Sequence, residues 1–408
     1  MKRSTKEEKL QSIIQSEKFL NQTQDLDVLL ETLLTEARTI VNADAGSIYV
    51  VEEDRLRIKY AQNNTQLKKL SAGEKLPFVS FSFPMNEYSI AGYVASKKEM
   101  LNIADVYNIA ADSTFKFNTQ PDKDTGYRTK SMLTIPLVAA SGKTLGVLQI
   151  INAQDSHANT IAFDENAELY LNHFAANATI ALERASLTRA MILRTIKMAE
   201  FRDPKETGAH VNRVASFAVE LYDRWAFEKE VPFETQHKYR DTLRIAAMLH
   251  DVGKVGISDS ILKKPARFTP EEHDIIKGHA VIGAALFNDI DTDIENMARD
   301  VALRHHERWD GTGYPGKIPP EVLENPFTPY QIRQGVSGEE IPLSARIVAL
   351  ADVFDALSSK RVYKDSWKEE DVYEEIRKSS GTHFDPDLVT MFFAILPRIK
   401  EIQAMWPD

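Results

Sequence analysis

Residues 245–254 read IAAMLHDVGK, and this stretch decides the character of the second half of the chain. An apolar run leads directly into His250 and Asp251, and Lys254 follows three residues later. A histidine and a carboxylate on a buried segment are costly unless they are paired or bound to a metal. If the stretch is helical, His250 and Lys254 lie one turn apart on one face. Alone, the pair also fits an ordinary buried histidine beside an aspartate.

Further imidazoles and carboxylates accompany this pair, because eight of the ten histidines follow residue 200. His305 and His306 are adjacent, and adjacent side chains on a helix point about 100° apart. We therefore expect these two imidazoles to face different metals. Asp352 follows the apolar run 347–351, so its carboxylate starts from a buried segment. The full candidate set comprises Glu206, His210, His250, Asp251, His279, His305, His306 and Asp352.

Five imidazoles and three carboxylates are too many ligands for a single ion. Such sets suit iron, manganese or zinc rather than copper(I). Two metals about 3.5–4 Å apart can clamp a phosphoryl group and generate hydroxide for in-line attack. The ligand set therefore indicates a centre of two or three divalent metals that acts on a phosphate ester.

Composition restricts the class of protein further. The chain has 408 residues, 43% hydrophobic and 27% charged, which is typical of two or three globular domains. Its formal charge of −10 argues against binding a DNA or RNA polymer or an anionic membrane. The absence of cysteine excludes disulfides, thiolate metal sites and a thiol-linked chromophore. The longest nearly apolar run, 132–140, is too short to cross a bilayer, and the charged N-terminus lacks a signal peptide. We expect a cytoplasmic protein.

Hydrophobic patterning divides the chain into two parts. Residues 5–41 read as a helix, and strands are predicted at 47–51, 132–138 and 145–151, with a hairpin turn at 140–143. Pro136 suggests an edge strand or a bulge. A helix over 165–201 contains no proline or glycine. Its apolar stripe has the 3.5-residue coiled-coil period and comprises Leu171, Phe174, Ala178, Ala181, Ala185, Thr188 and Ile192. The stripe packs either on its own domain or on a second copy, and we favour a dimerising connector.

The motifs of the second half resemble those of the HD-GYP phosphodiesterases, bacterial enzymes that hydrolyse cyclic di-GMP. The matches include HDVGK at 250–254, HHERWDGTGYP at 305–315, ADVFDAL at 351–357 and GTHFDP at 381–386. The resemblance implies that the eight candidate residues are metal ligands and that Asp251 bridges two metals. It also implies catalytic roles for Asp251 and Lys254. The implied substrate-binding residues are Lys254, Tyr314, Arg361 and Lys364.

This resemblance implies hydrolysis of cyclic di-GMP in second-messenger signalling, with either pGpG or, after a second cut, GMP as the final product. Glu206 resembles the extra ligand of the trinuclear subgroup, so three metals are favoured over two, with iron preferred and manganese the alternative. The motifs equally allow another cyclic dinucleotide, such as 3′,3′-cyclic GMP–AMP, or a non-catalytic module that senses nucleotides or docks a partner. Two departures concern substrate access: Val362 stands where proline is usual, and 321–334 reads as an insertion, either a lid, a partner surface or a plain loop.

The first half resembles a GAF domain, on the motifs DTGYRTKSMLTIPL at 124–137, GVLQIIN at 146–152 and FDE at 163–165. Ala153 replaces the lysine of the cyclic-nucleotide-binding pattern. The implied fold is an α+β GAF domain with an antiparallel sheet and flanking helices, joined by a long helix to an all-α HD-GYP domain. The expected boundaries are 1–183, 165–201 and 190–408. Implied partners are a second copy bound through the GAF and connecting helices, a small effector (or no ligand) at the GAF domain, and a diguanylate cyclase.

Overall fold

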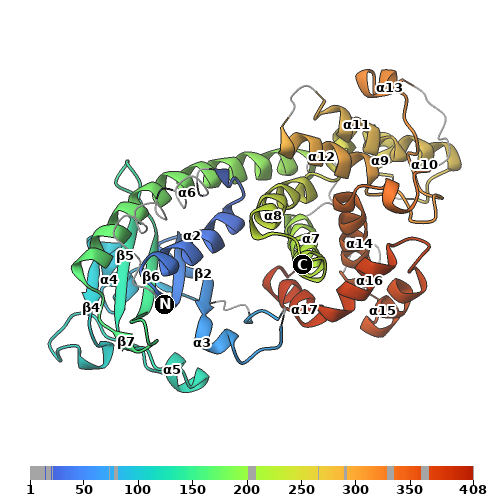
Figure 1. Ribbon diagram of the computed structural model, residues 1–408. Helices are drawn as coiled ribbons and strands as arrows, with labels where there is room; N and C mark the ends of the chain where they lie inside the picture. The colour runs from blue at the N-terminus through green and yellow to red at the C-terminus, as the bar shows by residue number, and fades with distance from the viewer. Residues whose placement is uncertain are drawn as a thin grey trace. The chain divides into compact units, whose positions relative to one another are not determined.

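The chain forms two compact units, residues 1–188 and 189–408, which are described separately. Figure 1 shows the computed structural model. It describes Ile14, Leu20 and residues 22–72, 74–77, 81–200, 208–264, 266–288, 292–328, 335–359 and 367–407. No helix within these ranges is long and apolar enough to cross a membrane.

The first unit is built on an antiparallel sheet, as the sequence predicts, with strand order β3-β2-β1-β6-β5-β4 and β7 paired to β6. The strands are β1 (Ala43–Glu52), β2 (Arg55–Asn63), β3 (Ser82–Pro84), β4 (Leu101–Ile103), β5 (Met132–Val138), β6 (Thr144–Gln154) and β7 (Thr160–Ile161). Pro136 pairs with Val147 on β6, whereas β4 ends opposite Thr134. Pro136 therefore has no ladder partner on β4, although β5 itself is not an edge strand, and the register between β5 and β6 shifts just after it, between Leu137 and Val138.

Helices cover both faces of this sheet (Figure 1). Alternate side chains of β1, β5 and β6, such as Ile48, Ile135 and Leu148, pack with α2 and α6 in the main core. Val94 of α4 packs with Tyr49 and Val147, which point to the opposite face. The helices are α2 (Leu26–Ile40), α3 (Asn64–Leu67), α4 (Ile90–Lys97), α5 (Gln120–Thr125), α6 (Glu165–Glu200) and the 3₁₀ turn η1 (Val106–Asn108).

The apolar stripe that suggested a coiled-coil seam on α6 packs instead inside the first unit. Leu171, Phe174, Ala178, Ala181 and Ala185 are all at most 1% exposed and belong to the main core. Over these five positions the stripe packs on its own domain and not on a second copy, whereas its last two positions, Thr188 and Ile192, are half-buried and lie outside this core.

A different face of α6 carries exposed apolar side chains. Leu169, Ile180 and Leu187 are 64%, 63% and 66% exposed. Their spacings of eleven and seven residues keep them on one side of the helix.

The second unit is helical, as predicted for an all-α domain. Its described residues form no β-ladder, apart from an isolated bridge between Ser380 and Phe384. The α-helices are α7 (Gly208–Glu228), α8 (Phe233–Met248), α9 (Asp259–Leu262), α10 (Pro270–Lys277), α11 (His279–Ala285), α12 (Asp293–Arg304), α13 (Pro320–Glu324), α14 (Leu343–Ser358), α15 (Glu369–Lys378), α16 (Pro386–Ala394) and α17 (Leu396–Met405). The 3₁₀ turns are η2 (Val252–Gly256) and η3 (Gly338–Glu340). Helices α7, α8, α12 and α14 pack on one another and carry, or end at, most of the candidate ligands.

Candidate metal centre

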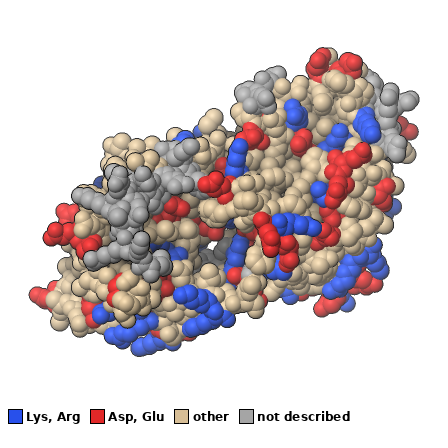
Figure 2. Space-filling view, viewed as in Figure 1, with Lys and Arg blue, Asp and Glu red and all other residues tan. Residues whose placement is uncertain are grey.

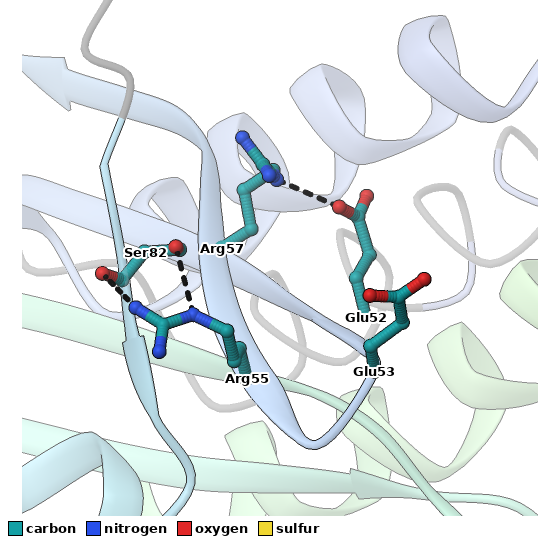
Figure 3. A pocket seen from close by; sticks show the side chains of 5 residues that line it. All are labelled: Glu52, Glu53, Arg55, Arg57 and Ser82. Carbon is teal, nitrogen blue, oxygen red and sulfur yellow. Dashed lines mark hydrogen bonds and ion pairs between the residues drawn. The ribbon is translucent and has the colours of Figure 1, made fainter.

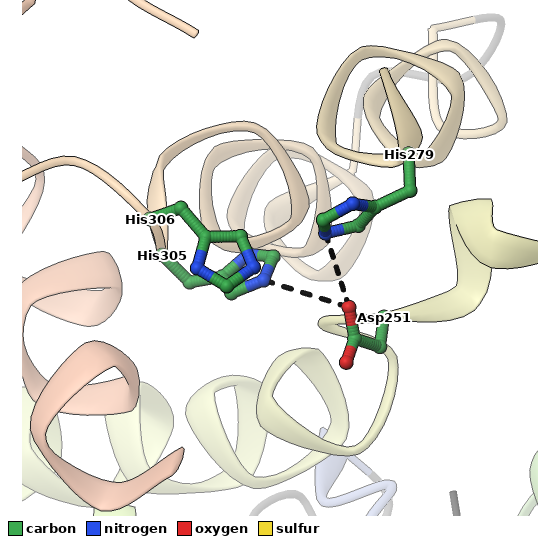
Figure 4. Close-up of side chains that lie close together, drawn as sticks. All are labelled: Asp251, His279, His305 and His306. Atoms are coloured by element: carbon green, nitrogen blue, oxygen red, sulfur yellow. Dashed lines mark ion pairs between the residues drawn. The ribbon is translucent and has the colours of Figure 1, made fainter. Parts of the chain in front are cut away.

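Four candidate ligands from three segments converge on one point (Figure 4). Asp251, His279, His305 and His306 each offer a ligand atom, and all four atoms lie within 4.8 Å of one another. Asp251 Oδ1 lies 3.1 Å from His279 Nε2 and 3.7 Å from His305 Nε2. We call this set the Asp251 group.

A second set lies beside the first and is called the His210 group. His210, His250 and Asp352 bring three ligand atoms within 4.8 Å of one another. Asp352 Oδ1 is 3.6 Å from His210 Nε2 and 4.0 Å from His250 Nε2. His250 Nε2 also lies 3.3 Å from Asp251 Oδ2, so the Asp251 carboxylate stands between the two groups.

Hydrogen bonds on the far side of the rings fix which nitrogen faces the centre. His250 Nδ1 bonds Ala247 O at 2.8 Å, and His279 Nδ1 bonds Ile276 O at 2.7 Å. His305 Nδ1 bonds Val301 O at 2.9 Å. A carbonyl oxygen only accepts, so each Nδ1 must carry a hydrogen and donate. This arrangement, in which the other ring nitrogen is bonded away, is typical of metal-binding histidines.

The Asp251 group therefore brings acceptors face to face. In a neutral imidazole whose Nδ1 donates, Nε2 presents a lone pair, and the nearest group here is a carboxylate oxygen. Asp251 Oδ1, His279 Nε2 and His305 Nε2 are buried and form no hydrogen bond with any residue that the structure describes. Burial lowers the pKa of His305, which opposes the protonated form that could otherwise bridge the gap. A divalent cation fits this donor set, since it accepts from all the facing lone pairs at once.

A glycine allows Asp251 to approach His279. Helix α8 ends at Met248, and the chain turns through His250 and Asp251 into η2. The sequence suggested that His250 and Lys254 lie on one face of an α-helix, but α8 ends before both residues. A Cβ on Gly253 would lie 2.0 Å from His279 O and 2.3 Å from Gly283 N. Only glycine lets η2 lie against α11 at this distance.

The adjacent histidines are not directed apart. Helix α12 ends at Arg304, and the chain leaves the helix at His305. The two rings lie 4.0 Å apart between centroids, and both belong to the Asp251 group. This grouping does not support the expectation that the two imidazoles face different metals, since His306 lies beyond the helix to which the 100° spacing applies.

The loop after these histidines is tied down by a buried carboxylate. Glu307 accepts from Arg304 Nη1 and Gly316 N at 2.8 Å, and from Val336 N at 3.1 Å. Tyr314 stacks on His306 with 4.7 Å between ring centroids. The aromatic ring of the GYP motif is thus held against the Asp251 group.

Lys254 sets the local charge. Its Nζ donates to Asp251 Oδ2 at 2.7 Å. Burial alone would raise the pKa of Asp251, but the charges of Lys254 and His250 hold it well below the usual range. The pKa of His306 lies well below its ordinary value, mainly because the ring is buried and secondarily because His305 is close. The centre therefore offers an ionised carboxylate and a neutral His306 imidazole, the forms that bind metals.

Three predicted site residues, Glu206, Arg361 and Lys364, lie outside the described residues. The suspected insertion is described up to residue 328. Its short helix α13 packs on α11, with Val322 buried against Val281 and Leu303.

The structure also brings in residues that received no role from the sequence. Asp355 accepts from His210 Nδ1 at 2.8 Å and from Arg213 Nε at 2.6 Å. Asp355 follows Asp352 by three residues on α14, a spacing that puts both on one helix face and could have suggested the link. His383 lies close enough to Asp352 and Arg308 to feel their charges, and burial lowers its pKa to about 4.

A charged recess of about 470 Å³ lies elsewhere, on the β1–β2 hairpin of the first unit (Figure 3). Both of its arginines already have partners within the recess: Arg57 bonds Glu52 at 2.7 Å and Arg55 bonds Ser82 O at 2.9 Å. On the face seen in Figure 2, acidic and basic side chains are interspersed. Neither feature competes with the buried histidines as a chemical site.

Comparison with known families agrees with this division. Residues 25–182 match the GAF domain family, and residues 207–357 match the HD domain family. A second HD domain family matches residues 331–388. The chain is a GAF–HD protein. Both metal-binding groups lie within the HD domain.

Several curated relatives of this GAF–HD protein are cyclic dinucleotide phosphodiesterases by name. A "Probable cyclic di-GMP phosphodiesterase" of Vibrio cholerae is 38% identical over 54% of this chain and 47% of its own length. The "Cyclic di-GMP phosphodiesterase" of Thermotoga maritima is 35% identical over 52% and 50%. The "3'3'-cGAMP-specific phosphodiesterase 2" of Vibrio cholerae is 34% identical over 57% and 39%. The match thus spans half or less of each relative's length.

Proposed function

We propose that this GAF–HD protein is a metal-dependent phosphodiesterase for a cyclic dinucleotide. The observation that carries the proposal is the Asp251 group, where a buried carboxylate oxygen faces the Nε2 atoms of two imidazoles whose Nδ1 atoms bond main-chain carbonyl oxygens. Such a centre attracts divalent cations, and divalent cations attract phosphate. Three relatives of this chain act on cyclic dinucleotides according to their names.

The proposed ligands are His210, His250, Asp251, His279, His305, His306 and Asp352, joined by Glu206. When bound, the metals supply Lewis-acid stabilisation of phosphoryl charge and a nucleophile at neutral pH. Asp251 stands between the two groups, which supports a bridging role.

The chain's own residues position the substrate. Lys254, whose ammonium lies beside Asp251, stabilises negative charge that develops on the scissile phosphate. Tyr314, stacked on His306, offers a ring against which the dinucleotide packs. Arg361 and Lys364 bind the second phosphate and guanine.

Cyclic di-GMP is the proposed substrate, cut to pGpG and then to GMP. The main competing substrate is 3′,3′-cyclic GMP–AMP, because relatives named for the two nucleotides match this chain at similar identity. Side-by-side kinetics with both nucleotides separates these alternatives.

The remaining parts of the proposal concern metals and regulation. We propose three metals, iron by preference and manganese otherwise, with Glu206 as the ligand that distinguishes three from two. The GAF domain regulates the HD domain through a small effector or through dimerisation, and a diguanylate cyclase is a proposed partner. The cytoplasmic location stays a prediction.

The decisive experiment is product analysis. Protein purified without oxygen is loaded with Fe(II) or Mn(II), mixed with cyclic di-GMP and followed by chromatography. We expect pGpG or GMP to appear and a chelator to stop it. Alanine at His250 and Asp251 should abolish metal uptake and turnover; wild-type activity in that variant would refute the proposal. A metal-loaded wild type that leaves both dinucleotides intact would favour a binding role.

A further inference from the structure

We propose that Asp355 and Arg213 form a positioning pair that sets the metal affinity of the His210 group independently of the Asp251 group. The inference rests on the metal binding in the proposed function and assigns a role to two residues outside the ligand set. In the contacts between described residues, His210 Nδ1 meets a carboxylate, whereas Nδ1 of His250, His279 and His305 meets a main-chain carbonyl oxygen.

The pair is defined by short contacts in a buried site. Asp355 Oδ2 accepts from His210 Nδ1 at 2.8 Å and from Arg213 Nη2 at 3.0 Å, while Oδ1 accepts from Arg213 Nε at 2.6 Å. The side chains of His210, Arg213 and Asp355 are at most 5% exposed. This two-point grip of a guanidinium on a carboxylate fixes the orientation of both planes.

The contact distinguishes His210 from the other anchored imidazoles. His250, His279 and His305 donate Nδ1–H to neutral carbonyl oxygens of their own preceding turn. His210 instead donates to a carboxylate carried by α14, the helix that also supplies Asp352. A charged acceptor raises the basicity of the opposite nitrogen, so His210 Nε2 is a stronger metal donor than a carbonyl-anchored imidazole.

Arg213 keeps that carboxylate in place from a second side. Its Nη1 donates to Trp406 O at 2.7 Å, immediately after α17. Thus α7, α14 and the segment after α17 meet at one guanidinium. The arrangement orients Asp355 toward His210 and leaves the Asp251 group to its own main-chain anchors.

The test compares metal content rather than activity alone. Asp355→Asn retains the shape and the acceptor oxygen but removes the charge. Mn(II) is titrated into metal-free protein, and bound metal per chain is counted by elemental mass spectrometry. We expect one site to weaken about 10- to 100-fold, the usual effect of losing such a partner. The remaining metal should bind as in wild type, and excess Mn(II) should restore turnover.

Two further variants separate positioning from folding. Asp355→Asn with Arg213→Gln removes both buried charges, so no guanidinium is left unpaired, and it should show the same selective loss. Glu220→Gln is the matched control. Glu220 also lies on α7 and forms an ion pair with an arginine, Arg398, at 3.2 Å, but it belongs to neither ligand group. It should bind metal like wild type.

The outcomes distinguish the two proposals. If Asp355→Asn binds all its metals with wild-type affinity, or loses both groups equally, the inference is overturned while the phosphodiesterase proposal stands. If the wild type binds no divalent metal, the proposed function falls and this inference with it.

Discussion

At the scale of single residues, Asp251 divides its carboxylate between two sets of neighbours. Its Oδ1 faces His279 and His305, whereas its Oδ2 lies near His250 and accepts from Lys254. In the proposed reaction, Lys254 therefore contacts a metal ligand and also stabilises charge on the substrate phosphate. Removing its ammonium should separate the two functions, since the ligands themselves stay in place.

Lys254→Met should lower kcat for the cyclic dinucleotide about 100- to 1,000-fold, the usual effect of deleting one group that stabilises transition-state charge. Metal content should stay at the wild-type level. Lys254→Arg, which keeps the charge, should recover part of the rate. Steady-state kinetics and elemental analysis of the same samples check this. A parallel loss of metal would show that Lys254 supports the ligands instead.

His383 should make the second unit sensitive to mild acid. Burial, the largest cause, lowers its pKa to about 4 from 6.5. Between these values the unfolded chain binds more protons than the folded one, so stability falls as the pH falls. The loss should be about 2 kcal/mol between pH 7.5 and 5.

The control for this effect is His383→Gln, which carries no charge at any pH. Urea unfolding of both proteins at the two pH values gives the difference directly. All four tryptophans (Trp225, Trp309, Trp367 and Trp406) belong to the second unit, so their fluorescence reports its unfolding alone. Equal pH dependence in wild type and variant would contradict the assignment.

At the scale of elements, the contact of η2 with α11 builds the Asp251 group. The contact is possible because Gly253 lies against the backbone of His279 and Gly283. The ligands come from separate segments, and each segment is placed by packing rather than by its neighbours in sequence.

Gly253→Ala should therefore remove metal binding as well as stability. The added Cβ would clash with His279 O at 2.0 Å, which forces η2 and α11 apart. We expect a cost of about 1–3 kcal/mol or more. Gly278→Ala is the control, since its φ of −59° is helical and its nearest contact is 3.0 Å. Metal titration and urea unfolding of both variants test this; similar behaviour of the two would refute it.

Helix α6 presents the other element-scale prediction. The first unit buries the stripe from Leu171 to Ala185, so we place the proposed dimer contact on the exposed face with Ile180 and Leu187. Ile180→Glu with Leu187→Glu should convert a dimer to a monomer in sedimentation without unfolding the protein. Leu171→Ala, at a fully buried position, should cost about 2–5 kcal/mol of folding stability. A wild type that sediments as a monomer contradicts the dimer.

At the scale of the whole molecule, metal binding and folding should be linked in the second unit. Ligand at about 1,000 times its dissociation constant adds about 4 kcal/mol of stability. For a unit of this size the expected rise in Tm is about 10 °C. The Tm of the second unit, followed by tryptophan fluorescence, should be higher by this amount in Mn(II)-loaded protein than in chelated protein. Signals from the tryptophan-free first unit, read by calorimetry, should stay unchanged.

The sequence correctly predicted an α+β first half and a helical second half. Hydrophobic period distinguished the strands of β1, β5 and β6 from the helices, and the ligand types pointed to metals. It could not show where helices end: His250 and His306 both lie just beyond one, because tertiary packing of η2 and α12 decides this. The apolar period of α6 correctly predicted a buried stripe. It could not show that the stripe from Leu171 to Ala185 packs on its own domain, because period alone does not identify the surface that covers a helix.

The anchoring of the imidazoles has a consequence for how the gene tolerates change. Ala247, Ile276 and Val301 hold their histidines through main-chain oxygens, and any amino acid at those positions supplies the same oxygen. Random mutation there cannot delete the contact except by moving the backbone. His210 alone among these four depends on the identity of a side chain. Asp355 is thus the anchor of these four that a single substitution can remove directly.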